Sequence, residues 1–182
     1  MKTSSPRHSV ARRSAGVGFT LIELLVVVVI GGILSAIAIP AMSSLASTRA
    51  GSATRMVVRD VSYARERAIA SGVQTWVVFA TAQNRYSVLS EDPANPGRAG
   101  ATALADPAKT GSTYVQAFGS NEYTGVSILS AAFDGAAEVG FDFLGRPLNT
   151  TGAALGAQGA VTLTGGRSVF VEIRTGLVWQ SP

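Results

Sequence analysis

The 182-residue sequence has no cysteine and a single histidine, His8. Without cysteine, the chain can form no disulfide, thiolate nucleophile, iron–sulfur cluster or cysteine-ligated zinc site. Its single lysine after residue 18, Lys109, lies in a proline-rich stretch, and the acids Asp134, Glu138 and Asp142 follow no catalytic spacing. Those acids would bind calcium only if folding brought them together. We therefore expect no enzyme, no cofactor and no metal.

Acidic residues are absent from the first 18 positions, which carry Lys2, Arg7, Arg12 and Arg13. The other 11 Lys and Arg residues balance all 11 Asp and Glu residues, so the formal charge of +4 resides in this segment. A short, basic and acid-free start is typical of a targeting segment, and we expect residues 1–18 to be a cleaved leader. Cleavage would leave a neutral chain without histidine, which excludes histidine acid–base catalysis and histidine metal ligation.

An apolar run extends from Phe19 to Pro40 and contains one charged residue, Glu23. As a helix, these 22 residues would span about 33 Å, enough to cross a hydrocarbon core of about 30 Å. The basic residues before the run orient its N-terminal end toward the cytoplasm. The sequence therefore predicts a transmembrane helix over 19–40, with the rest of the chain on the outer face.

The carboxylate of Glu23 is costly in such a helix, by roughly 2.5–3.5 kcal/mol at mid-membrane and less near the interface. In one interpretation, the side chain reaches the interface and needs no partner. In the other, it pairs with the ammonium group of Phe19, which cleavage after Gly18 would create one helical turn away. That pair would form within one subunit or between neighbouring subunits.

The sequence GFTLIE over residues 18–23, followed by an unbroken apolar helix, resembles the cleavage and methylation signal of type IV pilins and type II secretion pseudopilins. The resemblance implies that a prepilin peptidase cuts after Gly18 and N-methylates Phe19. It implies that Glu23 assists subunit docking and that Pro40 marks a point where the helix bends or melts on assembly. It also implies a single-pass protein of the bacterial inner membrane with a periplasmic C-terminal domain. Its partners would be other pseudopilins or pilins, an inner-membrane assembly platform and membrane lipid.

The pattern stays helical but becomes amphipathic over residues 41–72, where Val57, Val61, Ala64 and Ala68 follow steps of four, three and four. Charged side chains lie mostly off this stripe: Arg49, Arg55, Arg59, Asp60, Arg65, Glu66 and Arg67. Five arginines are compatible with a nucleic-acid surface, but a solvated helix face is favoured because Tyr63 is the single aromatic residue among them. Gly72 is a suitable helix end.

Residues 73–182 follow the period of β-strands. Turn-prone residues 82–84 join the first two runs into a hairpin, and a proline-rich segment over 91–112 predicts an exposed loop. Tight turns at 165–166 and 175–176 predict a C-terminal meander. The expected strands cover 73–80, 85–90, 114–118, 126–131, 138–143, 160–163, 168–174 and 177–180.

The FDFLGRP segment over 141–147, with the valine-rich strand and hairpin after it, resembles the GspH/FimT group of minor pseudopilins. Gly145-Arg146-Pro147 is interpreted as a turn rather than a binding site. The implied fold is α+β and pilin-like, with a long N-terminal helix on an antiparallel β domain. The implied function is that of a minor pseudopilin in a type II secretion pseudopilus. The alternative is a FimT-like minor pilin that takes part in pilus assembly or DNA uptake. Apolar residues after Arg174 and a neutral processed chain weaken phosphate binding, so we expect no nucleic-acid partner.

Overall fold

The computed structural model describes residues 18–181, with the side chains of residues 37–43 outside the described set. The expected leader over 1–18 therefore lies, except for Gly18, outside the described residues. The chain divides into two compact units between residues 41 and 42.

One long helix, α1 (Leu21–Ser71), precedes all the strands. Its end agrees with the prediction: Gly72 has a φ of 72°, and its N–H group donates to the carbonyl of Ala68 at 3.0 Å. A left-handed residue in this position closes the last helical turn, and glycine adopts it without steric cost.

Two antiparallel sheets follow α1, and the short 3₁₀ turns η1 (Thr81–Gln83), η2 (Arg98–Gly100) and η3 (Asn121–Tyr123) lie between strands. The first sheet has the order β3-β2-β1-β6-β7, and β4 also pairs with β2. Its strands are β1 (Thr75–Ala80), β2 (Arg85–Ser90), β3 (Thr102–Ala103), β4 (Val115–Ala117), β6 (Glu138–Phe141) and β7 (Pro147–Leu148). The second sheet has the order β10-β9-β8-β5 and consists of β5 (Ile128–Ala132), β8 (Gly159–Leu163), β9 (Ser168–Val171) and β10 (Val178–Gln180).

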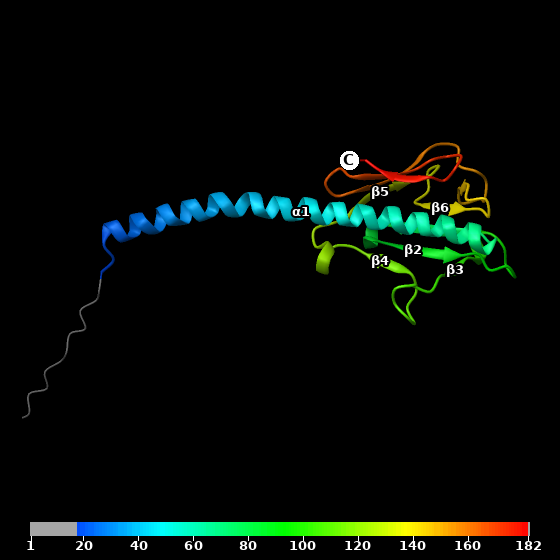
Figure 1. The fold of residues 1–182 in the computed structure, drawn as a ribbon, viewed down its shortest axis with the longest axis horizontal. Coiled ribbons are helices and arrows are strands. Elements are labelled where there is room, and N and C mark those ends of the chain that lie inside the picture. Colours follow the sequence, from blue (N-terminus) through cyan, green and yellow to red (C-terminus); the bar gives the residue numbers. More distant parts are fainter. Residues whose placement is uncertain (1–17, 182) are drawn as a thin grey trace, which may run out of the picture. The chain divides into compact units, whose positions relative to one another are not determined.

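The C-terminal half of α1 runs along both sheets of the second unit (Figure 1). The predicted stripe of Val57, Val61, Ala64 and Ala68 is completely buried and belongs to one core with the inner faces of both sheets. Small alanines on the helix leave room for large side chains opposite, such as Phe79 and Phe133, whose rings stack at 5.9 Å. This core confirms the predicted α+β class.

The strand predictions hold with small shifts in their ends, and the meander β8–β9–β10 is confirmed. Two strands were missed: β3, within the segment expected as a loop, and β7, in which Pro147 of the predicted turn pairs with Phe141. The prediction that 91–112 is simply exposed was wrong in two places, because Thr102 and Ala103 pair with β2 and both Gly100 and Asp106 are buried.

Asp60 was expected on the solvated face of the helix, and this was wrong: its side chain is fully buried against the first sheet. The Tyr86 hydroxyl on β2 donates to Asp60 Oδ2 at 2.6 Å, and Arg59 Nε donates to Oδ1 at 2.8 Å. Burial and the Asp60 carboxylate raise the pKa of Tyr86 well above its usual value. The same two causes raise the pKa of Tyr114, which directly precedes β4. Both phenols therefore stay protonated beside the buried carboxylate.

We predict that Asp60→Ala lowers the free energy of unfolding by about 3 kcal/mol, because it leaves the buried Tyr86 hydroxyl without its charged acceptor. Asp60→Asn keeps an oxygen for Tyr86 but loses the ion pair with Arg59, so a smaller loss of about 1–2 kcal/mol is expected. Urea unfolding of the full chain in detergent measures both variants. Glu66→Ala, an exposed acid on the same helix, is the matched control and should stay within about 0.5 kcal/mol of wild type. Equal urea midpoints for Asp60→Ala and wild type would contradict the stabilising role of the buried Asp60 carboxylate.

Candidate functional site

The bond between Gly18 and Phe19 lies directly before α1 in an exposed, non-helical stretch. A Cβ atom added to Gly18 would meet no other atom within 4 Å, so the fold itself does not require glycine here. The Phe19 side chain is 75% exposed. Within the described part of the chain, both predicted processing residues are therefore accessible to another protein.

Thr20 sets the start of α1, a role that was not predicted from the sequence. The backbone N–H of Glu23 donates to Thr20 Oγ1 at 3.2 Å and to the Thr20 carbonyl at 3.1 Å. Thr-x-x-Glu is the sequence of a helix capping box, in which the hydroxyl accepts from the third helical residue. A carboxylate in the first turn also interacts favourably with the helix N-terminus. A glutamate at position 23 therefore favours the start of the helix, in addition to the assembly contact predicted for it.

The first turns of α1 expose apolar side chains on every face. Those more than 45% exposed are Leu21, Ile22, Leu24, Leu25, Val26, Val27, Val28, Val29, Ile30, Ile33 and Leu34. Glu23 lies among them, is exposed, and has no ion-pair partner among the described residues.

Over residues 18–181, no helical stretch meets the length and apolarity needed to cross a membrane. The predicted span over 19–40 includes residues 37–40, whose side chains lie outside the described set. Pro40 falls within the bounds of α1, and its predicted role in bending the helix is not tested by the described residues.

The FDFLGRP segment forms a turn at the end of β6 that is held by hydrogen bonds of Asp142. Asp142 Oδ1 accepts from the backbone N–H groups of Leu144 and Arg146, and Oδ2 accepts from Arg146 Nε at 2.7 Å. Burial alone would raise the pKa of Asp142, but the hydrogen bonds and charge of Arg146 and the Leu144 N–H lower it below its usual value. The structure has a turn here, in which the Gly145 N–H donates to the Asp142 carbonyl at 2.8 Å, but Pro147 belongs to β7 and not to the predicted turn.

Arg65 of α1 joins this turn to the C-terminal hairpin. Its Nε group donates to the Gly145 carbonyl at 3.1 Å and to the Thr175 carbonyl at 2.9 Å. Gly176 lies so close that a Cβ atom there would overlap the Gly145 carbonyl oxygen. Two turns that are far apart in sequence therefore share one guanidinium as their support.

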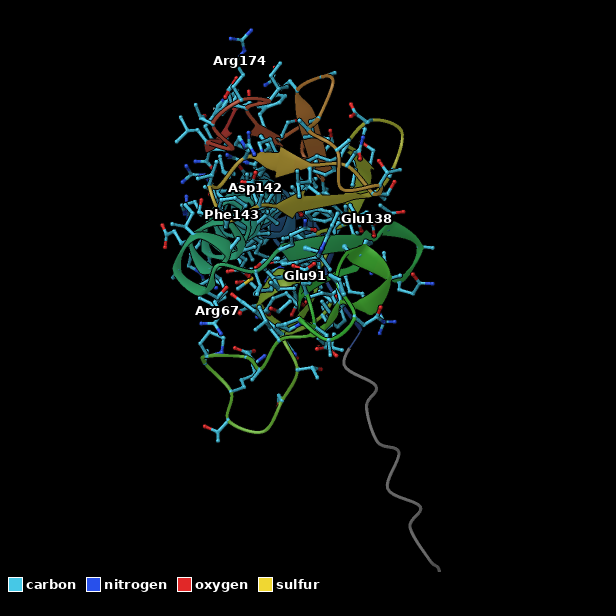
Figure 2. All side chains as sticks on the ribbon, turned by 90° about the vertical axis from the view of Figure 1, so that its right-hand side faces the viewer. Arg67, Glu91, Glu138, Asp142, Phe143 and Arg174 are labelled. Carbon is cyan, nitrogen blue, oxygen red and sulfur yellow. The ribbon has the colours of Figure 1, made fainter. Side chains whose placement is uncertain are left out.

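Arg174 projects from the β9–β10 turn, away from the rest of the domain (Figure 2). The turn is held by Glu172, whose Oε2 accepts from the N–H groups of Arg174 and Thr175 and from the Thr175 hydroxyl. The hydrogen bonds from Thr175 are the largest cause that lowers the pKa of Glu172. The hairpin places a single exposed arginine here, next to exposed Leu177.

The acids Asp134, Glu138 and Asp142 are not brought together, because each is bound to a different group. Asp134 accepts from the backbone of residues 156 and 157, Glu138 pairs with Arg98 at 2.8 Å, and Asp142 pairs with Arg146. Figure 2 shows Glu138 and Asp142 at separate places on the domain. Among the described residues, no three His, Cys, Asp or Glu side chains are grouped as metal ligands.

The arginines of α1 bind different partners. Arg59 pairs with Asp60, Arg65 supports the two turns, and Arg55 donates to Ser52 at 3.1 Å. Arg67 is exposed. Two of the five arginines are thus engaged within the domain, Arg59 by an ion pair and Arg65 by two carbonyl groups.

The family model of the prokaryotic N-terminal methylation motif matches residues 18–39. Two structures of the minor pseudopilin EpsH from the type II secretion system of Vibrio cholerae match the domain with TM-scores of 0.51 and 0.52, at 11% and 12% identity. Each match covers 73% of this chain, and 96% and 93% of the respective EpsH chain. The type IV minor pilin FimU from Pseudomonas aeruginosa has a TM-score of 0.44 at 13% identity, covering 72% of this chain and 92% of FimU. No curated protein sequence matches the chain.

The chain thus carries the N-terminal motif of prepilin-like proteins at the start of its long helix. The domain that follows has the pilin-like α+β fold, in the form seen in the minor pseudopilin EpsH. The resemblance drawn from residues 18–23 agrees with the matched motif, and the resemblance drawn from the C-terminal strands agrees with the matched fold.

We predict that the stabilisation from Asp142 depends on pH. Because its folded-state pKa is lowered, its contribution is present above the ordinary aspartate value of about 3.9 and is lost as the pH falls through the lower folded-state value. Asp142→Asn should therefore unfold at lower urea than wild type at pH 7, by about 1 kcal/mol, and equally with wild type near pH 2. A difference that persists unchanged at pH 2 would show that the charge of Asp142 is not the cause.

Proposed function

We propose that this protein is a minor pseudopilin, a structural subunit of a type II secretion pseudopilus that drives protein export. The observation that supports this most is the combination, in one chain, of the N-terminal methylation motif with the fold of EpsH. Neither feature alone separates this role from others, because the motif is shared by many filament subunits and a fold does not imply a function.

We further propose that the apolar start of α1 anchors the chain in the bacterial inner membrane, with the N-terminus in the cytoplasm and the β domain in the periplasm. A helix that exposes apolar side chains on every face needs lipid or other protein around it. The basic residues before Phe19 favour this orientation. In the filament, the partners of the helix would be the helices of other pseudopilins.

Processing by a prepilin peptidase is the first step of this function. The peptidase would cut after Gly18 and methylate the new amino group of Phe19. Both residues are accessible, and Gly18 has open space around it in the fold. The requirement for glycine would therefore come from the peptidase, because a side chain at Gly18 crowds its approach to the bond.

We predict that Gly18→Val prevents maturation, whereas Gly31→Val does not. Gly31 is the matched control, because it also lies in the N-terminal segment and a Cβ atom there also meets nothing within 4 Å. Mass spectrometry of protein from cells with an active prepilin peptidase gives the N-terminus directly, with N-methyl-Phe19 expected for wild type and Gly31→Val. An intact leader on the wild-type protein would overturn the proposed processing.

Glu23 has two possible roles, one at the start of the helix and one in subunit assembly, and different substitutions can separate them. It stands third in the Thr20 capping box, where glutamate and glutamine serve equally well. Only a carboxylate, however, can pair with the Phe19 ammonium of a neighbouring subunit. Because a lone charge among apolar side chains is costly, such a pair would recover part of that cost on assembly and fix the axial register.

We predict that Glu23→Gln is processed normally but assembles poorly with partner pseudopilins, because it keeps the cap and loses the charge. Glu23→Asp, which is one methylene shorter, should assemble to an intermediate level, and Glu23→Leu should resemble Glu23→Gln. Co-purification with the other pseudopilins measures assembly, and the cleavage assay controls for insertion. If Glu23→Gln joins its partners at the wild-type level, the carboxylate is not an assembly contact, and the interfacial interpretation is right.

The partners recovered in this experiment also distinguish the secretion role from a role in a type IV pilus. Recovery of pseudopilins supports the proposal, whereas recovery of pilins would replace it. Salt-sensitive retardation of duplex DNA by the full chain, lost in Arg174→Gln, would point to DNA uptake instead.

A further inference from the structure

The outer face of the first sheet contains a hollow of about 370 Å³. Val77 and Phe79 of β1 point into the core with α1, so the residues that alternate with them point to the opposite, outer face. Residues directly opposite each other in neighbouring strands share a face, and the register therefore defines the lining. Three rows of side chains contribute to it: Val78, Ser87 and Val115; Ala80 and Arg85; and Leu89 and Ala103.

The chain covers only one part of this outer face. Trp76, which pairs with Leu89 and points to the same side, is completely buried. Arg98, from the segment that follows β2, reaches Glu138 of β6 at 2.8 Å, and Glu138 pairs with Val78. Val78 and Leu89 themselves remain half-buried. The hollow is thus the part of the face that the described residues leave open.

The lining of the hollow is apolar except at one end. Its apolar side chains are Val78, Ala80, Leu89, Ala103 and Val115. Arg85, at the hairpin end of β2, is the one charged residue among the described residues that line it. Arg85 is exposed, and it forms no ion pair within residues 18–181. An apolar floor that ends at one guanidinium, with a volume inside the range of roughly 300–1,000 Å³ for small-molecule sites, is suited to an apolar ligand with one negative charge.

We infer that this hollow binds an aliphatic carboxylate, that is, an unbranched apolar chain with one carboxylate group, such as a medium-chain fatty acid. The carboxylate would accept from the Arg85 guanidinium, which binds planar anions through two parallel hydrogen bonds. The apolar chain would cover Val78 and Leu89 and remove their remaining apolar surface from water. Leu89 lies four residues beyond Arg85 along β2, about 13 Å away at the rise of a strand, which suits a chain of medium length. This site is independent of the proposed function.

A polypeptide C-terminus carries the same carboxylate but fits the hollow less well. Its peptide N–H and C=O groups need hydrogen-bond partners when they leave water. The backbone groups of β1 and β2 beneath the hollow are already paired in ladders with each other and with β6 and β4. The Tyr86 hydroxyl is bound to Asp60 on the other side of the sheet, which leaves Ser87 as the uncharged polar side chain of the described lining. An aliphatic chain needs no such partners.

The test uses the full chain in detergent micelles, with ¹³C-labelled valine and leucine methyl groups observed by NMR. The probe is octanoate, and the control ligand is octanamide, which has the same chain and an uncharged head group. The methyl groups of Val78, Leu89 and Val115 report on the hollow, and those of Val57 in the core are the reference. We expect saturable shifts with octanoate at about millimolar concentration, and binding of octanamide that is at least about fivefold weaker.

Two substitutions test the charge and the shape of the site separately. Arg85→Gln should weaken octanoate binding by at least about fivefold, because it keeps a polar side chain but loses the charge. Ala103→Leu should also weaken binding, because a larger side chain at this exposed position fills the hollow from β3. Arg67→Gln, which removes an exposed arginine of α1, is the matched control and should bind octanoate as wild type does. Since octanoate partitions into the micelles equally for all variants, differences between them report on the site.

The competing occupant is tested with acetyl-leucyl-leucine, which has a free carboxylate and peptide groups. Weaker binding of this peptide than of octanoate supports the inference. Equal or tighter binding would assign the hollow to a polypeptide C-terminus and overturn it. Octanoate shifts that do not saturate, equal binding of octanamide, or wild-type affinity in either Arg85→Gln or Ala103→Leu would also overturn the inference.

Discussion

The buried carboxylate of Asp60 fixes the position of the second half of α1 on the first sheet. Apolar packing of small residues such as Ala64 and Ala68 is tolerant of sliding, because alanine side chains offer little shape to interlock. A charged acceptor that must meet the Tyr86 hydroxyl at 2.6 Å is not tolerant, since a shift of one residue would leave both groups buried and unpaired. The core stabilises the contact between helix and sheet, and Asp60 specifies its register.

Arg65, five residues further along, performs a similar task at the end of the domain. Its guanidinium binds carbonyls from two turns that are 30 residues apart in sequence, at Gly145 and Thr175. Each turn is also fixed by its own carboxylate, Asp142 in one and Glu172 in the other. Loops that are held in this way present rigid surfaces, which suits a subunit whose contacts must repeat accurately in an assembly.

The N-terminal unit differs from this domain, because the residues that begin its helix also carry the methylation motif and are followed by exposed apolar side chains. Thr20 and Glu23 begin the helix by local hydrogen bonds, and the apolar residues after them find no covering within their own unit. Glu23 takes part in the helix start only through its backbone N–H, which donates to Thr20. The assembly contact proposed above would use a different part of the residue, its exposed side-chain carboxylate.

The local features of this protein follow from its sequence: the methylation motif over 18–23, the buried stripe from Val57 to Ala68, the helix end at Gly72 and most strands. Each depends on residues close together in the chain, where periodicity and turn chemistry suffice. Only the tertiary structure decided that Asp60 and Asp106 are buried, that Ile69 at the edge of the helical stripe stays 45% exposed, and that Arg65 is bound by two turns. A charged residue in a helix or loop pattern is ordinarily solvated, and its burial depends on partners from distant strands. Which strand brings a tyrosine or a carbonyl to that place is determined by sheet order and register, which local sequence does not encode.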